Sequence, residues 1–126
     1  MNRIQSFRDL DVWTKAMDLV VSVYALTDTF PRHELYGLTD QTRRAALSVP
    51  TNIAEGNGRL YRGEYAHYAA IARGSVSELV TCLEISRRLK YATDAAIEAI
   101  LQQASAVSAM LTMLIRALRR PPPVKS

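Results

Sequence analysis

The stretch SVPTNIAEGNGR, residues 48–59, interrupts a chain that otherwise repeats apolar residues at helical spacing. Pro50 has no backbone N–H and its ring opposes the carbonyl four residues earlier, so we expect the helix to bend or restart there. Ser48 is then expected to cap the restarted turn. Gly56 and Gly58 are expected to supply the left-handed residues that end it.

This stretch predicts a polar knot, by which we mean a set of residues that ends one helix and fixes the turn into the next. The amide of Asn52 is expected to bond to the backbone of neighbouring helices. Glu55 stands near a helix C-terminus, where the helix dipole disfavours a carboxylate, and Arg59 follows four residues later to compensate it. The predicted members of the polar knot are Asn52, Glu55, Gly56, Gly58 and Arg59.

The same stretch does not fit the phosphate-binding or catalytic motifs. A Walker loop requires a lysine after its glycines, a dinucleotide loop requires three spaced glycines after a strand, and GNGR meets neither requirement. Ser48 has no histidine near it in sequence to act as a base, and the chain contains only His33 and His67. We therefore expect a protein that is not an enzyme and has no evident small-molecule substrate.

A metal site is not expected either. Glu64 and His67 form an E-x-x-H pair, but di-iron helical bundles use two such motifs on different helices, and this chain has one. We predict a surface pair, no metal and no cofactor. Cys82, the one cysteine, has no partner for a disulfide and is expected to be a small buried apolar side chain.

Apolar residues recur at spacings of three and four in four segments, which predicts four helices. The first covers about residues 7–29, and the second begins near Thr39 and ends in the polar knot. The third covers about residues 61–91, and the fourth opens with Thr93 as its N-cap and runs to the prolines at 121–123. No segment alternates with period two, so strands are not expected.

Short connections between long helices make neighbours run in opposite directions. We therefore predict an all-α fold, an antiparallel up-down-up-down four-helix bundle over residues 1–120, followed by a Pro-rich flexible tail over residues 121–126. The chain has one cysteine, no apolar signal-peptide core, and no apolar run near the roughly 20 residues that span a bilayer. These features favour a cytoplasmic protein with no membrane partner.

The predicted helices carry more apolar surface than one bundle needs. The first helix has a second apolar row, and the second helix has Leu47 beside its core stripe. A second stripe favours a second partner, although wide stripes also pack more deeply in a small core. We predict a homo-oligomer whose candidate interface residues are Trp13, Met17, Val21, Tyr24 and Leu47.

The net charge of +4 arises in the C-terminal third of the chain. In the predicted topology, one end of the bundle collects more arginines than acids. RNA or DNA is therefore a possible partner. The alternative is that these cations only stabilise helix C-termini. The candidate nucleic-acid-binding residues are Arg59, Arg62, Arg116, Arg119 and Arg120.

Three segments resemble one known family. They are FRDLDVWTKAMDLVVSVYALTDTFP at residues 7–31, ELYGLTDQTRRAALSVPTNIAEGNGR at 34–59 and EYAHYAAIARGSVSELVTCLEIS at 64–86. In order and content they are similar to the bacterial four helix bundle proteins, also called 23S rRNA-intervening-sequence proteins. The NIAEG and GS…EL motifs carry the specificity of the resemblance.

The resemblance implies an antiparallel four-helix bundle that assembles into a ring-like homopentamer. It implies no established enzymatic activity. A distant relative is a basic pentamer that works with a reverse transcriptase and nucleic acid. Two functions therefore remain open: an oligomer that binds nucleic acid through its basic end, and a protein–protein interaction scaffold with no nucleic-acid role.

Overall fold

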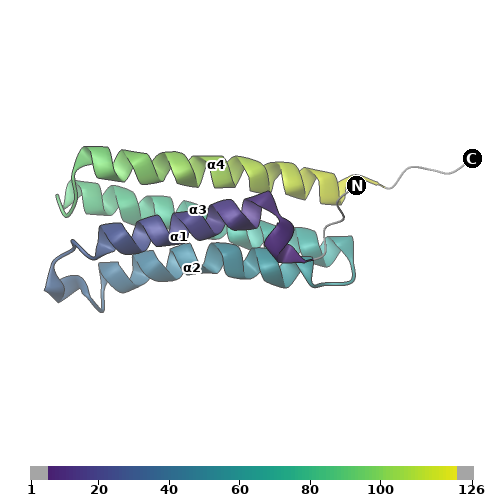
Figure 1. Cartoon of the computed structure of the whole chain (residues 1–126), viewed down its shortest axis with the longest axis horizontal. Helices are drawn as coiled ribbons and strands as arrows, with labels where there is room; N and C mark the ends of the chain where they lie inside the picture. The colour runs from purple at the N-terminus through teal and green to yellow at the C-terminus, as the bar shows by residue number, and fades with distance from the viewer. Residues whose placement is uncertain (1–5, 122–126) are drawn as a thin grey trace, which may run out of the picture.

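The computed structural model describes residues 6–121 of the chain (Figure 1). Within this range it contains helices and no strand, which confirms the prediction of an all-α chain with four long helices. The elements are η1 (Phe7–Asp9), α1 (Asp11–Thr27), η2 (Arg32–Glu34), α2 (Leu38–Asn57), α3 (Arg62–Arg88) and α4 (Asp94–Arg119). The predicted tail at residues 122–126 lies outside the described residues.

The four α-helices lie lengthwise beside one another, and short connections join consecutive helices at alternating ends (Figure 1). α2 packs against α1 and α3, and α4 packs against α3 and α1. Hydrogen bonds between α2 and α3 pair rising residue numbers on one helix with falling numbers on the other: Gln41 with Glu78, Ser48 with Ser75, and Asn57 with Tyr65.

The predicted apolar stripes form the core. Each α-helix contributes a row of buried side chains to one continuous cluster. Burying each large aliphatic side chain contributes about 1.5–3 kcal/mol to the free energy of folding. The largest fully buried apolar side chains are Leu19, Ile53, Leu79, Leu83, Ile97 and Leu111.

The helix termini are capped in several ways. Thr93 accepts a hydrogen bond from the backbone N–H of Ala96 at 3.2 Å, which confirms it as the N-cap of α4. α2 starts after Gly37, which has no side chain to cap it, and the carboxylate of Glu34 accepts from the N–H of Leu38 at 3.1 Å instead. This hydrogen bond, together with one donated by Tyr91, lowers the pKa of Glu34.

The connection from α3 to α4 contains a residue in the left-handed conformation, although no glycine in this segment predicts one. Lys90 has φ of 61°, and it is the one non-glycine residue with positive φ within residues 6–121. The N–H of Lys90 bonds to Arg87 and the N–H of Tyr91 bonds to Ser86, both at 3.0 Å. These two bonds form a Schellman motif, which satisfies carbonyls at the end of α3.

One helix differs from the expectation that no segment could span a bilayer. By length and composition alone, α4 is long and apolar enough to cross a membrane. This is weak evidence, since the core helix of a soluble protein passes the same test. α4 also has a face that packs as a core helix does, with Ile97, Ile100, Ala104, Val107, Leu111 and Ile115 buried.

Candidate functional site

α2 continues through Pro50 as one helix, so the expected restart with Ser48 as its cap is wrong. The missing N–H and the proline ring oppose a helix interior by about 3 kcal/mol. Packing outweighs this cost, because Val49, Pro50 and Ile53 are all buried. Residues on both sides of the proline therefore belong to one continuous helix.

Ser48 and Asn52 link α2 to α3. The Asn52 amide donates to the carbonyl of Ser48 at 2.8 Å and to its hydroxyl at 2.9 Å, so it bonds within its own helix and not to neighbouring helices as expected. The hydroxyls of Ser48 and Ser75 lie 2.7 Å apart. Since the Ser75 hydroxyl also donates to the Ile71 carbonyl at 3.2 Å, the Ser48 hydroxyl is the donor between the two serines.

The partners of Ser48, Glu64 and His67 limit what these side chains could do in catalysis. Neither Ser75 nor Asn52 can act as a base toward the Ser48 hydroxyl. Glu64 is paired with Arg59, and His67 packs edge-on against Tyr68. Within residues 6–121, no group of three or more His, Cys, Asp or Glu side chains is placed to hold a metal ion.

Gly56 allows α2 and α3 to approach closely. A Cβ built at this position would lie 2.8 Å from the Cβ of Tyr68 and 3.0 Å from the Cδ1 of Tyr65. The expectation that Gly56 and Gly58 are left-handed is wrong, since no glycine among the described residues has positive φ, and Gly58 has φ of −79°. Gly56 thus acts through the space that it leaves, and not through its conformational freedom.

Arg59 joins the end of α2 to the start of α3. Its guanidinium donates to Glu55 at 3.1 Å and to the hydroxyl of Tyr68 at 2.8 Å, and it lies 3.7 Å from Glu64. It also stacks over the Tyr68 ring, 4.9 Å from the centroid. The predicted pair of Glu55 and Arg59 is therefore present, but both side chains are exposed enough for water to weaken it.

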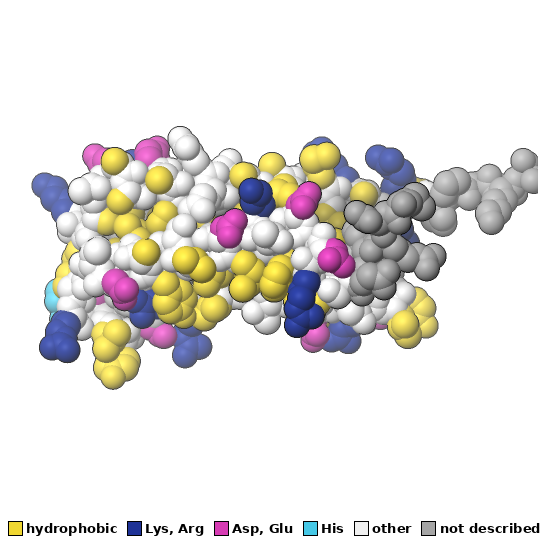
Figure 2. Space-filling model, in the orientation of Figure 1, with side chains coloured by type: hydrophobic (Ala, Val, Ile, Leu, Met, Phe, Trp, Pro, Cys, Tyr) yellow, Lys and Arg dark blue, Asp and Glu magenta, His cyan; other side chains and the backbone are white. Residues whose placement is uncertain are grey.

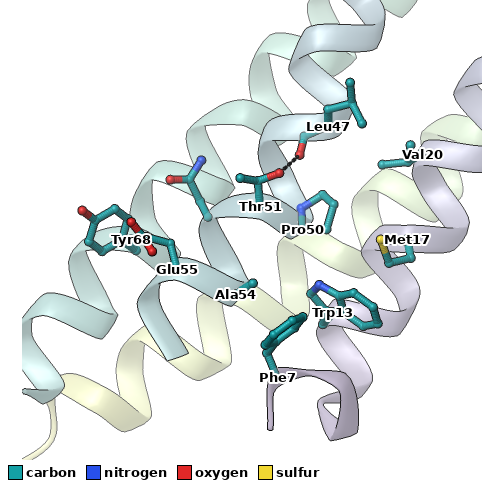
Figure 3. Close-up of a pocket in the computed structure, with 11 residues that line it drawn as sticks. Phe7, Trp13, Met17, Val20, Leu47, Pro50, Thr51, Ala54, Glu55 and Tyr68 are labelled. Atoms are coloured by element: carbon teal, nitrogen blue, oxygen red, sulfur yellow. Dashed lines mark hydrogen bonds between the residues drawn. The ribbon is translucent and has the colours of Figure 1, made fainter. Parts of the chain in front are cut away.

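An open groove of about 720 Å³ lies between α1 and α2 (Figure 3). Phe7 and Trp13 pack edge to face at one end of it, with ring centroids 5.2 Å apart. Met17 faces Pro50 across the groove, and Glu55 and Tyr68 stand together at its margin. The lining is mostly apolar, and its polar members Thr51 and Asn52 donate to carbonyls of their own helix.

The groove is part of a larger apolar surface. We call it the α1/α2 face, and define it as Trp13, Met17, Val21, Tyr24, Leu35, Tyr36 and Leu47. Hydrophobic side chains follow the seam between the two helices on the visible side of the molecule (Figure 2). Val21 is 68% exposed and Tyr36 is 92% exposed, so the structure brings the predicted interface residues onto one surface and adds Leu35 and Tyr36 to it.

The predicted basic residues lie at one end of the bundle. The start of α3 and the end of α4 meet there, because Arg62 donates to the carbonyl of Ala117 at 2.6 Å. Arg116, Arg119 and Arg120 are exposed, and within residues 6–121 none of them is paired with a carboxylate. We call these three residues the α4 arginines. Arg59, by contrast, is already bound by two carboxylates, so less of its charge remains for a ligand.

Several residues of these surfaces could not be identified from sequence patterns. The hydrogen bond of Ser75 with Ser48 depends on the register of α2 against α3, which residue spacing along one helix does not predict. Arg43 stacks over Tyr24 at 4.6 Å and bonds to Asp28 at 2.9 Å, which fixes α1 against α2 beside the α1/α2 face. Tyr61 is 68% exposed in the turn between α2 and α3.

Comparison with known proteins identifies relatives. A family model described as 23S rRNA-intervening sequence protein matches residues 8–113. The crystal structure of a protein of unknown function from the S23 ribosomal protein family of Bacteroides thetaiotaomicron VPI-5482 is similar, with a TM-score of 0.78 at 22% identity, over 83% of this chain and 98% of that chain. At that identity the likeness is one of fold. No curated protein matches the chain.

The role of Gly56 can be tested with alanine. We expect Gly56→Ala to lower the free energy of unfolding by about 1–3 kcal/mol, because the new Cβ meets the Tyr68 Cβ and a backbone carbonyl that cannot easily move. The matched control is Gly74→Ala in α3, where a Cβ meets nothing within 4 Å. That change should stabilise the protein by up to about 1 kcal/mol through helix propensity.

Urea denaturation of both variants measures these free energies. A Gly56→Ala protein as stable as Gly74→Ala would show that the close approach of α2 and α3 does not matter.

Proposed function

This chain belongs to the 23S rRNA-intervening sequence protein family, and from that premise we propose that it is a non-enzymatic, homo-oligomeric scaffold. Each subunit is an up-down-up-down bundle, and the subunits meet through the α1/α2 face. The resemblance stated above suggests five subunits, and the single cysteine suggests the cytoplasm as the site of action.

The observation that supports this proposal most directly is the α1/α2 face. Apolar side chains exposed singly are ordinary on a monomer, whereas a contiguous apolar surface over a groove is typical of an interaction site. Here Met17, Tyr24 and Leu47 line two adjoining hollows, and Val21 lies one helical turn from Met17 and from Tyr24 on α1; the four side chains are between 37% and 68% exposed. Contact with a second subunit would remove this surface from water.

A charge placed on the α1/α2 face tests the assembly. We expect Val21→Glu and Leu47→Glu each to reduce the native mass toward the 14.1 kDa of the monomer, because an interface would have to bury an unpaired carboxylate. Met113→Glu is the matched control, since Met113 is 70% exposed on α4, away from this face. It should leave the assembled mass unchanged.

Light scattering after gel filtration gives the mass, and circular dichroism checks that each variant is folded. A wild-type protein that elutes as a clean monomer at micromolar concentration would remove the proposal.

A second function, binding of RNA or DNA, is favoured by the α4 arginines. At the opposite end of the bundle Arg43, Arg44 and Arg87 are bound to carboxylates, while Arg32, Arg88 and Lys90 are exposed and, among the described residues, outside the ion pairs. The α4 arginines are exposed without such partners among the described residues, so their charge is available to phosphate. In an assembly, this end would repeat and several modest sites would act together.

Charge reversal tests this second function. Changing Arg116, Arg119 and Arg120 to Glu should abolish binding, because each phosphate contact becomes a repulsion. The matched control changes Arg32, Arg88 and Lys90, exposed cations at the opposite end, to Glu, and should retain binding. Wild-type affinity should fall as the salt concentration rises. A plot of log affinity against log salt concentration should have a slope of about −0.9 for each duplex phosphate contacted.

Filter binding at several salt concentrations gives these values. Equal binding by the Arg116, Arg119 and Arg120 variant and the wild type would exclude the α4 arginines as the site.

A further inference from the structure

We propose that the turn between α2 and α3 recognises single-stranded nucleic acid, with Tyr61 as the surface on which an unpaired base stacks. The α4 arginines beside the turn would hold the phosphates on either side of that base. This inference rests on the nucleic-acid function proposed above, and adds to it the class of nucleic acid that is preferred and the residue that makes the preference.

Tyr61 differs from most tyrosines of this protein. The hydroxyls of Tyr65, Tyr68 and Tyr91 bond to Asn57, Arg59 and Glu34, and the ring of Tyr24 is covered by Arg43. Tyr61 is 68% exposed, and within residues 6–121 neither its ring nor its hydroxyl has such a partner. Its neighbour Leu60 is 91% exposed. The turn thus presents an aromatic ring to solvent with no structural contact to account for it.

The turn is fixed beside the α4 arginines. Arg62 follows Tyr61 directly, and its guanidinium donates to the carbonyl of Ala117 in the last turn of α4 at 2.6 Å. This bond ties the start of α3 to the last turn of α4, the segment that carries Arg116 and Arg119. Hydrophobic and cationic side chains are both visible at this end of the molecule (Figure 2).

Arg59, which precedes the turn, stacks over the Tyr68 ring, 4.9 Å from its centroid, and is therefore engaged elsewhere. The exposure of the Tyr61 side chain leaves its ring accessible to a flat ligand.

A stacked base requires an unpaired strand. The bases of a duplex are stacked on one another, and their faces are not available to a side chain. An unpaired base presents its face, and stacking on an aromatic ring is tolerant of sequence because every base has one. Cationic groups beside the ring then follow the backbone. A tyrosine next to three exposed arginines matches this combination.

Fluorescence anisotropy with a labelled oligouridylate of about 15 nucleotides, and with an RNA duplex of equal length, tests the inference. We expect Tyr61→Ala to weaken binding of the single strand roughly five- to hundredfold, which is the range for loss of one stacked base. Binding of the duplex should not change. Tyr61→Phe keeps the ring and should bind the single strand like the wild type.

Leu60→Ala is the matched control, because Leu60 is 91% exposed in the same turn but has no ring on which a base could stack, so the change should not affect binding. The inference is overturned if Tyr61→Ala binds the single strand as the wild type does, or weakens both ligands equally. In either case, continued loss of binding on reversal of the α4 arginines would leave the nucleic-acid function itself intact. If the wild type binds neither ligand, both proposals fail together.

Discussion

The close contact between α2 and α3 is the constraint on which the rest of this structure depends. The missing Cβ of Gly56 lets the backbone of α2 approach Tyr65 and Tyr68, and the Ser48–Ser75 hydrogen bond fixes the register two turns away. With this register set, Pro50 can lie inside a continuous helix, because its neighbours are buried on both sides. Within the stretch, Ser48 and Arg59 hydrogen-bond to Ser75 and Tyr68 of α3, and Asn52 hydrogen-bonds to Ser48.

This contact also decides what the molecule presents to partners. One side of α2 packs against α3, so the apolar residues on its other side can contact only α1 or another molecule. Phe7, Trp13 and Pro50 partly cover that side and leave a groove. At the end of the bundle, Arg59 and Arg62 anchor the turn through Tyr68 and Ala117, which leaves Leu60 and Tyr61 as outward side chains. The packing of α2 against α3 therefore leaves two distinct exposed surfaces, the α1/α2 face and the turn that carries Tyr61.

Much of this could be predicted from the sequence because it depends on local spacing. The four helices, the Thr93 cap and the Glu55–Arg59 pair all follow from residues three or four apart. The roles of Gly56 and Pro50 could not be predicted from the sequence, since they depend on which residues of α3 lie opposite them. Lys90 carries no glycine signal for its left-handed turn, and Tyr61 looks like any helix-flanking aromatic until its exposure is known. Composition alone does not reveal that one face of α4 is buried against the bundle, so this packing could not be predicted from its apolar length.

Native-state hydrogen exchange across α2 tests the central claim most directly. If packing against α3 holds α2 together through Pro50, the amides of residues 51–54 should exchange only by global unfolding, with the same free energy as those of residues 72–79 in α3. The contradicting result is faster exchange of residues 51–54 by local opening while residues 72–79 remain protected. That result would mean that the helix yields at the proline and that the α2–α3 seam does not organise the fold.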